Sequence, residues 1–238
     1  MGQVYAGCGL VLTAVLLSGC MEAGSGGGVV EVVPPPSQSA APAVATAPEA
    51  ARALPPGLIP ADPKVYAARS DNGRNLPAID VAAFHPELLR NRVAFQTSEA
   101  PGTIVIDTKG PFLYFVEPDG MATRYGIAIG REGFGWTGTG TIARTARWPT
   151  WTPPPEMIAR DPSLKKWAGG MPGGVDNPLG ARALYIYFGG SDSGFRVHGT
   201  NQPKSIGWAA SSGCFRMLNQ DVIDLYDRVG RGAKVVVM

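Results

Sequence analysis

Cys214 and His198 are the residue types that nucleophilic catalysis by a thiol requires, in a chain of 238 residues. Cys214 follows Ser211, Ser212 and Gly213, a polar turn unlike the interior of a strand, and Gly213 gives the backbone freedom to project the thiol. A thiol is mostly protonated at neutral pH, so a catalytic cysteine needs a histidine or a cationic environment. His198, sixteen residues earlier, is the candidate base.

Each of these residues also has a structural interpretation. A lone cysteine can be a small buried hydrophobe, and a lone histidine can simply be a hydrogen-bonded packing residue. The other histidine, His85, lies in an irregular segment and is expected to pack or to face solvent. The strand predicted over 195–198 turns Arg196 and His198 to one face and leads into a polar loop, the kind of segment that lines active sites. The combination favours the catalytic interpretation.

The first twenty residues predict an export signal. The apolar run over 9–17 is too short to span a bilayer and is followed by small residues. Its end, Leu17-Ser18-Gly19-Cys20, resembles the lipobox of bacterial lipoproteins, whose cysteine is lipidated and becomes the mature N-terminus. No Lys or Arg precedes the run, so an uncleaved anchor and an unmodified Cys20 stay open as alternatives. If residues 1–20 are a lipoprotein signal, Cys214 is the only thiol left without a lipid or a disulfide partner.

The composition predicts one globular domain with appendages. Hydrophobic residues make up 45% of the chain and charged residues 17%, enough to bury one substantial core. The formal charge is only +2 and the basic residues are scattered, so nucleic acid is not an expected partner. Residues 21–60 are rich in Gly, Ala, Pro and Ser, and we expect a disordered linker there because they cannot bury enough apolar area to offset their ordering entropy.

The remaining sequence predicts a mainly β domain. Residues 61–100 form a lead-in with a helical turn or two that packs on the domain, and the domain itself covers 101–238. The Gly-, Pro- and Trp-rich stretch 133–180 predicts a long loop region over a cleft, whose tryptophans pack or contact substrate. Segments rich in β-branched and aromatic residues predict strands over 103–108, 112–116, 124–129, 183–188, 195–198 and 234–237.

A short helix is predicted just after Cys214. Apolar residues recur at helical spacing between Asn219, a favourable N-cap, and Gly230, a favourable C′ residue. Asp221 in the first turn and Arg228 in the last turn suit the helix dipole. The helix should therefore fix the chain directly beyond the candidate nucleophile.

His198-Gly199-Thr200, followed by Ser211-Ser212-Gly213-Cys214-Phe215-Arg216-Met217, resembles the signature of the L,D-transpeptidase catalytic domain, also called the YkuD domain. The similarity covers about 101–238. It implies an L,D-transpeptidase-type mixed β-sandwich or barrel with a short helix after the catalytic cysteine. The common form of the motif has a histidine where this chain has Ser212, so activation of the thiol should rest on His198 alone.

The resemblance also implies a mechanism. Cys214 attacks the carbonyl of the L-centre of a peptidoglycan tetrapeptide stem, expels the terminal D-Ala and forms a thioester that an amine resolves. His198 takes the thiol proton and later protonates the leaving amine. The backbone carbonyl of Gly199 orients the imidazole ring. The backbone N–H groups of Ser212, Gly213 and Cys214 form the oxyanion hole.

Three more side chains are candidates for substrate binding. Arg216 could bind a carboxylate of the stem peptide through its planar fork of donors, or it could form a structural salt bridge or clamp a carbonyl. Ser211 and Thr200 could direct hydroxyl groups toward the thiol. For both residues, a hydrogen bond that braces a loop is the alternative.

The acyl acceptor stays open. An amine of another stem gives a cross-link, an amine of an envelope protein attaches that protein to the wall, and water makes the enzyme an L,D-carboxypeptidase. A non-catalytic peptidoglycan-binding lipoprotein is a further alternative, against which the intact Cys-His pair argues. One Cys and two His cannot supply the usual set of three or four nitrogen and sulfur ligands of a metal without carboxylates, and no cofactor is implied. The expected location is the periplasm or cell envelope, with a membrane anchor through a lipid on Cys20.

Overall fold

A computed structural model describes residues 55–131, 136–211 and 213–238. The predicted signal 1–20 with Cys20, and the linker up to residue 54, lie outside the described residues. Within the described ranges, no helix has both the length and the apolar character needed to cross a membrane. The strands are β1 (Leu58–Pro60), β2 (Arg69–Asp71), β3 (Arg74–Leu76), β4 (Asn91–Ala94), β5 (Ile104–Asp107), β6 (Phe112–Val116), β7 (Met121–Gly130), β8 (Gly138–Arg147), β9 (Arg182–Phe188), β10 (Ser191–His198), β11 (Ala209–Ser211), β12 (Phe215–Met217) and β13 (Lys234–Val237). The helices are α1 (Pro155–Arg160) and α2 (Asn219–Arg228), with 3-10 turns η2 (Pro63–Tyr66), η3 (Val81–Ala83), η4 (Pro86–Leu88), η5 (Pro162–Trp167) and η6 (Pro203–Ser205).

One sheet closes on itself to form a barrel. Its strands pair in the order β7, β12, β10, β9, β8, β13, β5 and β6, and β6 pairs back with β7. Strands β4 and β1 branch from β7 outside this ring, β11 lies beside the end of β7, and β2 and β3 form a separate hairpin. Closure satisfies strand edges that would otherwise stay unpaired. The predicted fold class, mainly β and of sandwich or barrel type with a short helix after Cys214, is confirmed.

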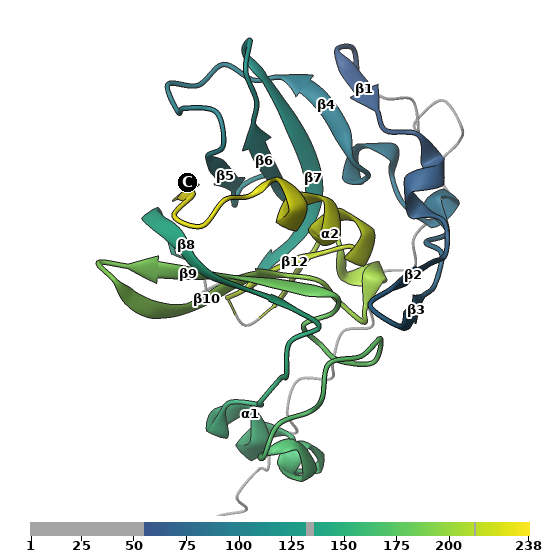
Figure 1. The fold of residues 1–238 in the computed structure, drawn as a ribbon, viewed down its shortest axis with the longest axis vertical. Helices are drawn as coiled ribbons and strands as arrows, with labels where there is room; N and C mark the ends of the chain where they lie inside the picture. The colour runs from purple at the N-terminus through teal and green to yellow at the C-terminus, as the bar shows by residue number, and fades with distance from the viewer. Residues whose placement is uncertain (1–54, 132–135, 212) are drawn as a thin grey trace, which may run out of the picture. The chain divides into compact units, whose positions relative to one another are not determined.

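Helix α2 lies between the β5–β7 part and the β8–β10 part of the sheet (Figure 1). Its side chains Val222 and Leu225 are fully buried in one hydrophobic cluster with strand residues that include Ile104 and Ile142. Each such side chain contributes about 1.5–3 kcal/mol when buried. A helix this short owes its stability to that packing, because isolated helices below about 12 residues are marginal in water.

The start of α2 differs from the prediction. Leu218 occupies the N-cap position without a side-chain cap, and Asn219 is the first helical residue, so the prediction of Asn219 as N-cap is wrong. The Asn219 amide turns away from its own helix and binds backbone groups of Ala181 and Thr200. Both the oxygen and the NH₂ group of the Asn219 amide are hydrogen-bonded in this position, whereas an N-cap contact would have used only the oxygen.

The loop region predicted over 133–180 contains a long strand, β8, which pairs with β9 and β13. That part of the prediction is wrong because β8 has few aliphatic residues. Gly140 shows one physical reason, since a Cβ there would lie 2.8 Å from Ile186 Cγ2 and 2.9 Å from the carbonyl oxygen of Tyr187. After β8 the chain does run without long elements, and α1 projects away from the sheet (Figure 1).

The lead-in adds strands and a buried ionic contact to the fold. Strand β4 pairs with β7 and β1 pairs with β4. Arg90 lies 3.0 Å from Asp221 and 2.9 Å from Asp224, and the Tyr66 hydroxyl donates to Asp221 at 3.0 Å. Burial raises the pKa of Asp221 to about 6, while Arg90 and Tyr66 act in the opposite direction. The lead-in therefore supplies the cation and the hydroxyl that a fully buried carboxyl group of α2 requires.

The β2–β3 hairpin makes a second tie to the barrel. Asp71 accepts hydrogen bonds from both terminal nitrogens of Arg182 at 2.8 Å and from the indole of Trp148 at 2.7 Å. The hydrogen bonds from Arg182 hold the pKa of Asp71 below its usual range. The Arg182 side chain is 1% exposed, and its own carbonyl accepts the N–H of Gly199 at 3.1 Å. The hairpin thus neutralises the arginine that borders the histidine loop.

Candidate active site

Cys214 and His198 come onto one face of the sheet through the parallel pairing of β10 with β12. Val197 pairs with Phe215, and His198 pairs with Arg216. Val197 and Phe215 are buried in the core, so the residues before and after them face the opposite side. Cys214, one residue before Phe215, therefore faces the same side as His198. In this structure no hydrogen bond joins the Cys214 sulfur to the His198 ring.

The partly buried Cys214 thiol faces the backbone of β10. Its sulfur lies 3.9 Å from the carbonyl oxygen of Gly194, and the backbone N–H of Arg196 offers a hydrogen bond that lowers the thiol pKa. Burial is the larger influence and raises the pKa of Cys214 above its ordinary value. At neutral pH the residue is a thiol, so a reaction at its sulfur would require a base to remove the proton.

His198 is a buried, neutral base. Its Nδ1 lies 2.6 Å from the carbonyl oxygen of Gly199. A carbonyl only accepts, so Nδ1 carries the hydrogen and Nε2 of the neutral ring keeps its lone pair. Burial lowers the pKa of His198 to about 4, with Arg216 and Arg196 acting in the same direction and the Gly199 contact opposing them. The imidazole is therefore uncharged and able to accept a proton at Nε2 at neutral pH.

Ser211 braces the turn that carries the thiol. Its hydroxyl donates to the carbonyl oxygen of Cys214 and accepts from the N–H of Gly213 at 3.1 Å. Gly213 has φ 112°, a backbone conformation that L side chains rarely adopt. Ser212, between them, lies outside the described residues. The Ser211 hydroxyl and the Gly213 N–H are thus already used within the turn.

Gln202 contacts two more of the candidates. Its N–H donates to the Thr200 hydroxyl at 3.0 Å, so that hydroxyl braces a loop, and its side-chain oxygen accepts from Arg216 at 3.2 Å. Arg216 forms no ion pair with the residues that the structure describes. Across the same residues, no three His, Cys, Asp or Glu side chains gather to hold a metal ion. The site offers a thiol, an imidazole and guanidinium groups as its chemistry.

Comparison with known proteins decides the family. Residues 101–237 match the family model described as the L,D-transpeptidase catalytic domain, YkuD. The chain belongs to the L,D-transpeptidase family. The predicted resemblance is therefore confirmed, and the cysteine–histidine face described above lies within the matched residues.

Individual relatives match over part of their length. The chain is 34% identical over 144 residues to the probable L,D-transpeptidase ErfK/SrfK of Escherichia coli K12, covering 57% of this chain and 43% of that protein. It is 35% identical over 142 residues to the probable L,D-transpeptidase YcfS of the same strain, with the same coverage of 57% and 43%. The chain thus spans less than half the length of these relatives. A crystal structure described as a probable carnitine operon oxidoreductase from Brucella melitensis is 52% identical, with a TM-score of 0.44, over 63% of this chain and 92% of that one.

One group that supports the histidine loop of this L,D-transpeptidase domain was missed in the sequence. Asn219 accepts from the N–H of Ala181 at 2.8 Å and donates to the carbonyl of Thr200 at 2.8 Å. A Cβ at Gly180 or at Gly199 would lie 2.2 Å from the Asn219 side-chain oxygen, so the two glycines make room for it. Asn219 therefore packs against the residue whose carbonyl binds the His198 ring. An asparagine at a helix start normally caps that helix, and this preference concealed its actual partners.

The protonation state of His198 can be tested directly. We expect its ring to titrate near pH 4 in the folded protein, with the hydrogen on Nδ1, because burial disfavours the imidazolium ion. Long-range proton–nitrogen NMR spectra across a pH series, with His198→Gln to assign the signals, measure both features. The lowered pKa also contributes stability that is complete above about pH 6.5 and is lost as the pH falls toward 4. A midpoint near 6.5, or an Nε2–H tautomer, would contradict this description.

The positioning role of Asn219 predicts a linked effect on stability and on the histidine. Asn219→Ala leaves the Ala181 N–H and the Thr200 carbonyl unpaired, which costs about 1–3 kcal/mol for each group. Urea unfolding should report this loss, and the His198 Nδ1 proton signal should shift or broaden as Gly199 loosens.

Asn201→Ala is the matched control for Asn219→Ala. Asn201 donates a single exposed hydrogen bond to the carbonyl of Asp176 at 2.8 Å, so its loss should cost less than about 1 kcal/mol. An unchanged His198 signal in a folded Asn219→Ala protein would remove Asn219 from any role in positioning the ring.

Proposed function

We propose that this protein is a peptidoglycan L,D-transpeptidase with Cys214 as nucleophile and His198 as general base and acid. The observation that carries the proposal is the register of β10 and β12, which turns a partly buried thiol and a neutral imidazole to the same face. Membership of the L,D-transpeptidase family supports the reaction class. We take the substrate to be a tetrapeptide stem, cleaved between its L-centre and the terminal D-Ala.

The first half-reaction transfers the acyl group to the enzyme. The Cys214 sulfur attacks the carbonyl carbon of the L-centre while His198 Nε2 takes the thiol proton. Because burial raises the thiol pKa and lowers the imidazole pKa, this proton moves as the carbon–sulfur bond forms and not before. The carbon–nitrogen bond then breaks, Nε2 returns the proton to the amine of D-Ala, and a thioester remains.

The negative oxygen of the tetrahedral intermediate needs backbone donors. The Gly213 N–H donates to the Ser211 hydroxyl in this structure, so we assign the main role to the N–H of Cys214 itself. The Ser212 N–H, from the same turn, is a second proposed donor outside the described residues. The charges of Arg196 and Arg216, which favour the thiolate over the thiol, also favour an anionic intermediate.

The second half-reaction resolves the thioester. An amine attacks the thioester carbonyl carbon, and His198 Nε2 takes a proton from the amine. The carbon–sulfur bond breaks, Nε2 returns the proton to the Cys214 sulfur, and the acyl group remains on another stem or on an envelope protein. We propose that Arg216 binds a carboxylate of the substrate. Its guanidinium donates one hydrogen bond, to the amide oxygen of Gln202, and forms no ion pair with the described residues. We assign loop-bracing roles to Ser211 and Thr200, whose hydroxyls bind backbone groups.

Turnover of a disaccharide tetrapeptide tests the assignment. With an amine acceptor present, we expect mass spectrometry to detect D-Ala release and an amine adduct. Cys214→Ala should abolish both products, and His198→Gln should lower kcat/KM by about 100- to 10,000-fold. Ser205→Ala, which removes an exposed hydroxyl of the same loop, is the control and should retain activity. D-Ala release with water as the only acceptor would make the protein an L,D-carboxypeptidase, and no release would reject the proposal.

We propose that the domain works in the cell envelope on a flexible tether. The chain would consist of a signal over 1–20, a linker over 21–60, a lead-in over 61–100 and a catalytic domain over 101–238, with a lipid on Cys20. The sequence supports this arrangement through the lipobox-like segment and the composition of the linker.

Metabolic labelling with palmitate checks the anchor. Label on the full-length protein should disappear in Cys20→Ala. It should persist in Cys8→Ala, the matched control from the same predicted signal. Label that survives Cys20→Ala would exclude lipidation at that position.

A further inference from the structure

A row of stacked side chains crosses the catalytic face of the sheet. Arg144 of β8 and Arg196 of β10 both pair in register with Tyr185 of β9. The Arg144 guanidinium carbon lies 3.3 Å from the centre of the Tyr185 ring, and that of Arg196 lies 4.4 Å from it. Tyr185 is only 6% exposed. Arg196 is also the residue whose backbone N–H and charge act on the Cys214 sulfur, so the row ends at the nucleophile.

A β-bulge places Arg144 in this row. Ile142 pairs with Ile186, yet Arg144 pairs with Tyr185, so Ala143 is an extra residue in β8. In a ladder without the bulge, Ala143 would pair with Tyr185 and Arg144 with Leu184, on the side where Ile142 and Leu184 are fully buried. Bulges commonly redirect a side chain in this way. Here the redirection brings a cation to the catalytic face.

Arg144 is the exposed end of the row with an open fork of donors. Asp192 occupies the Arg196 guanidinium with contacts of 2.7 and 2.9 Å. Arg144 forms no ion pair within the described part of the chain. The charges of Arg144 and Arg196 both act on the carboxylate of Asp192, but that carboxylate pairs with Arg196. Stacking on Tyr185 fixes the plane of the Arg144 guanidinium and leaves its N–H edge for a bidentate contact. A planar anion is the ligand that such a group suits.

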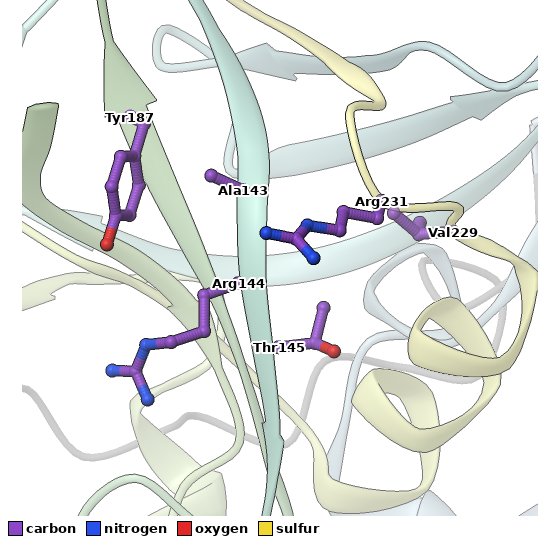
Figure 2. Close-up of a pocket in the computed structure, with 6 residues that line it drawn as sticks. All are labelled: Ala143, Arg144, Thr145, Tyr187, Val229 and Arg231. Carbon is purple, nitrogen blue, oxygen red and sulfur yellow. The ribbon is translucent and has the colours of Figure 1, made fainter. Parts of the chain in front are cut away.

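Open space adjoins this arginine. Figure 2 shows Arg144 and Tyr187 on one side of β8, whereas Arg231 and Thr145 lie on the other, so Arg231 is not part of the row. The hollow has a volume of about 420 Å³. It is lined by Ala143, Arg144, Thr145, Tyr187, Val229 and Arg231.

We propose that Arg144 binds a carboxylate of the donor stem at a distance from the reacting carbonyl. The inference rests on the proposed function, and it makes the substrate class an anionic stem peptide with a free carboxylate. The Arg144 guanidinium lies over Tyr185 of β9, and from β9 to β12 the sheet crosses two strand spacings, about 10 Å. One extended residue of the stem, the arm of its carboxylate and the hydrogen bond to the guanidinium, about 3 Å each, together span that distance. A stem whose carboxylate is amidated would lose the charge-assisted contact.

Binding measurements on full-length Cys214→Ala protein test this without turnover. The probes are a disaccharide tetrapeptide chosen to carry a free carboxylate on its second residue, the one before the L-centre, and the same compound with that carboxylate amidated. We expect the free acid to bind about tenfold more tightly by titration calorimetry, with a gap that shrinks as salt is added. Arg144→Gln should remove the gap and leave the affinity for the amidated compound unchanged. Arg144→Lys should keep part of the gap, because it retains the charge without the fork.

Arg147→Gln is the control for charge. It removes one cation from the same strand, but Arg147 lies over Tyr226 of α2, and the gap should persist. An affinity difference between the two probes that survives Arg144→Gln, or no such difference in the Cys214→Ala protein, overturns the proposal.

Turnover separates this outcome from a failure of the catalytic assignment. D-Ala release without discrimination between the probes rejects the Arg144 site alone, whereas a binding gap without D-Ala release by the wild-type protein supports the site and rejects the catalytic assignment.

Discussion

The parallel pairing of β10 with β12 is the contact on which the candidate site depends. Parallel strands cannot be joined by a tight turn, so the chain leaves β10, pairs with β7 as β11 and returns through the turn that carries Cys214. A slip of one residue would turn Cys214 into the core and Phe215 out of it. Phe215 is 1% exposed, and Met217 beyond it is fully buried. Hydrophobic burial of these two neighbours thus fixes the face on which the thiol lies.

Burial of Cys214 and His198 on the opposite face sets the charge state of the site. It raises the pKa of Cys214 and lowers that of His198, so the resting pair is a neutral thiol and a neutral imidazole. Arg196 and Arg216 favour a thiolate and oppose an imidazolium ion. An ion pair formed before substrate binds would therefore gain little from its surroundings. In the proposed mechanism, the same two guanidiniums favour the negative oxygen that develops as the sulfur attacks, so the site is more complementary to the intermediate than to the neutral carbonyl of the substrate.

Local sequence was sufficient for the mainly β class and for strands such as β5, β6, β9 and β13, because β-branched runs and turn residues report directly on nearby backbone. The barrel was implied by the family resemblance, and the short strands β11 and β12 on either side of Cys214 were not predicted. It was insufficient where a side chain serves a distant segment. Asn219 looks like an N-cap, yet its partners lie in loops that only the fold brings close. Strand β8 was hidden because Gly140 packs too tightly for a side chain and Ala143 forms a bulge that breaks the alternation. The bulge that concealed the strand is also what brings Arg144 to the face that holds Cys214 and His198.

The lead-in shows why a family boundary and a folding boundary need not coincide. The family match begins at residue 101, but Arg90 pairs with the buried Asp221, and Asp71 pairs with the buried Arg182. Breaking one buried pair by removing a partner costs about 3–5 kcal/mol, and a whole domain has about 5–15 kcal/mol of stability. Losing both partners would consume much of that margin. The described residues of the lead-in and of the matched domain belong to one compact unit. The loop that holds His198 is therefore supported by residues that the family motif does not contain.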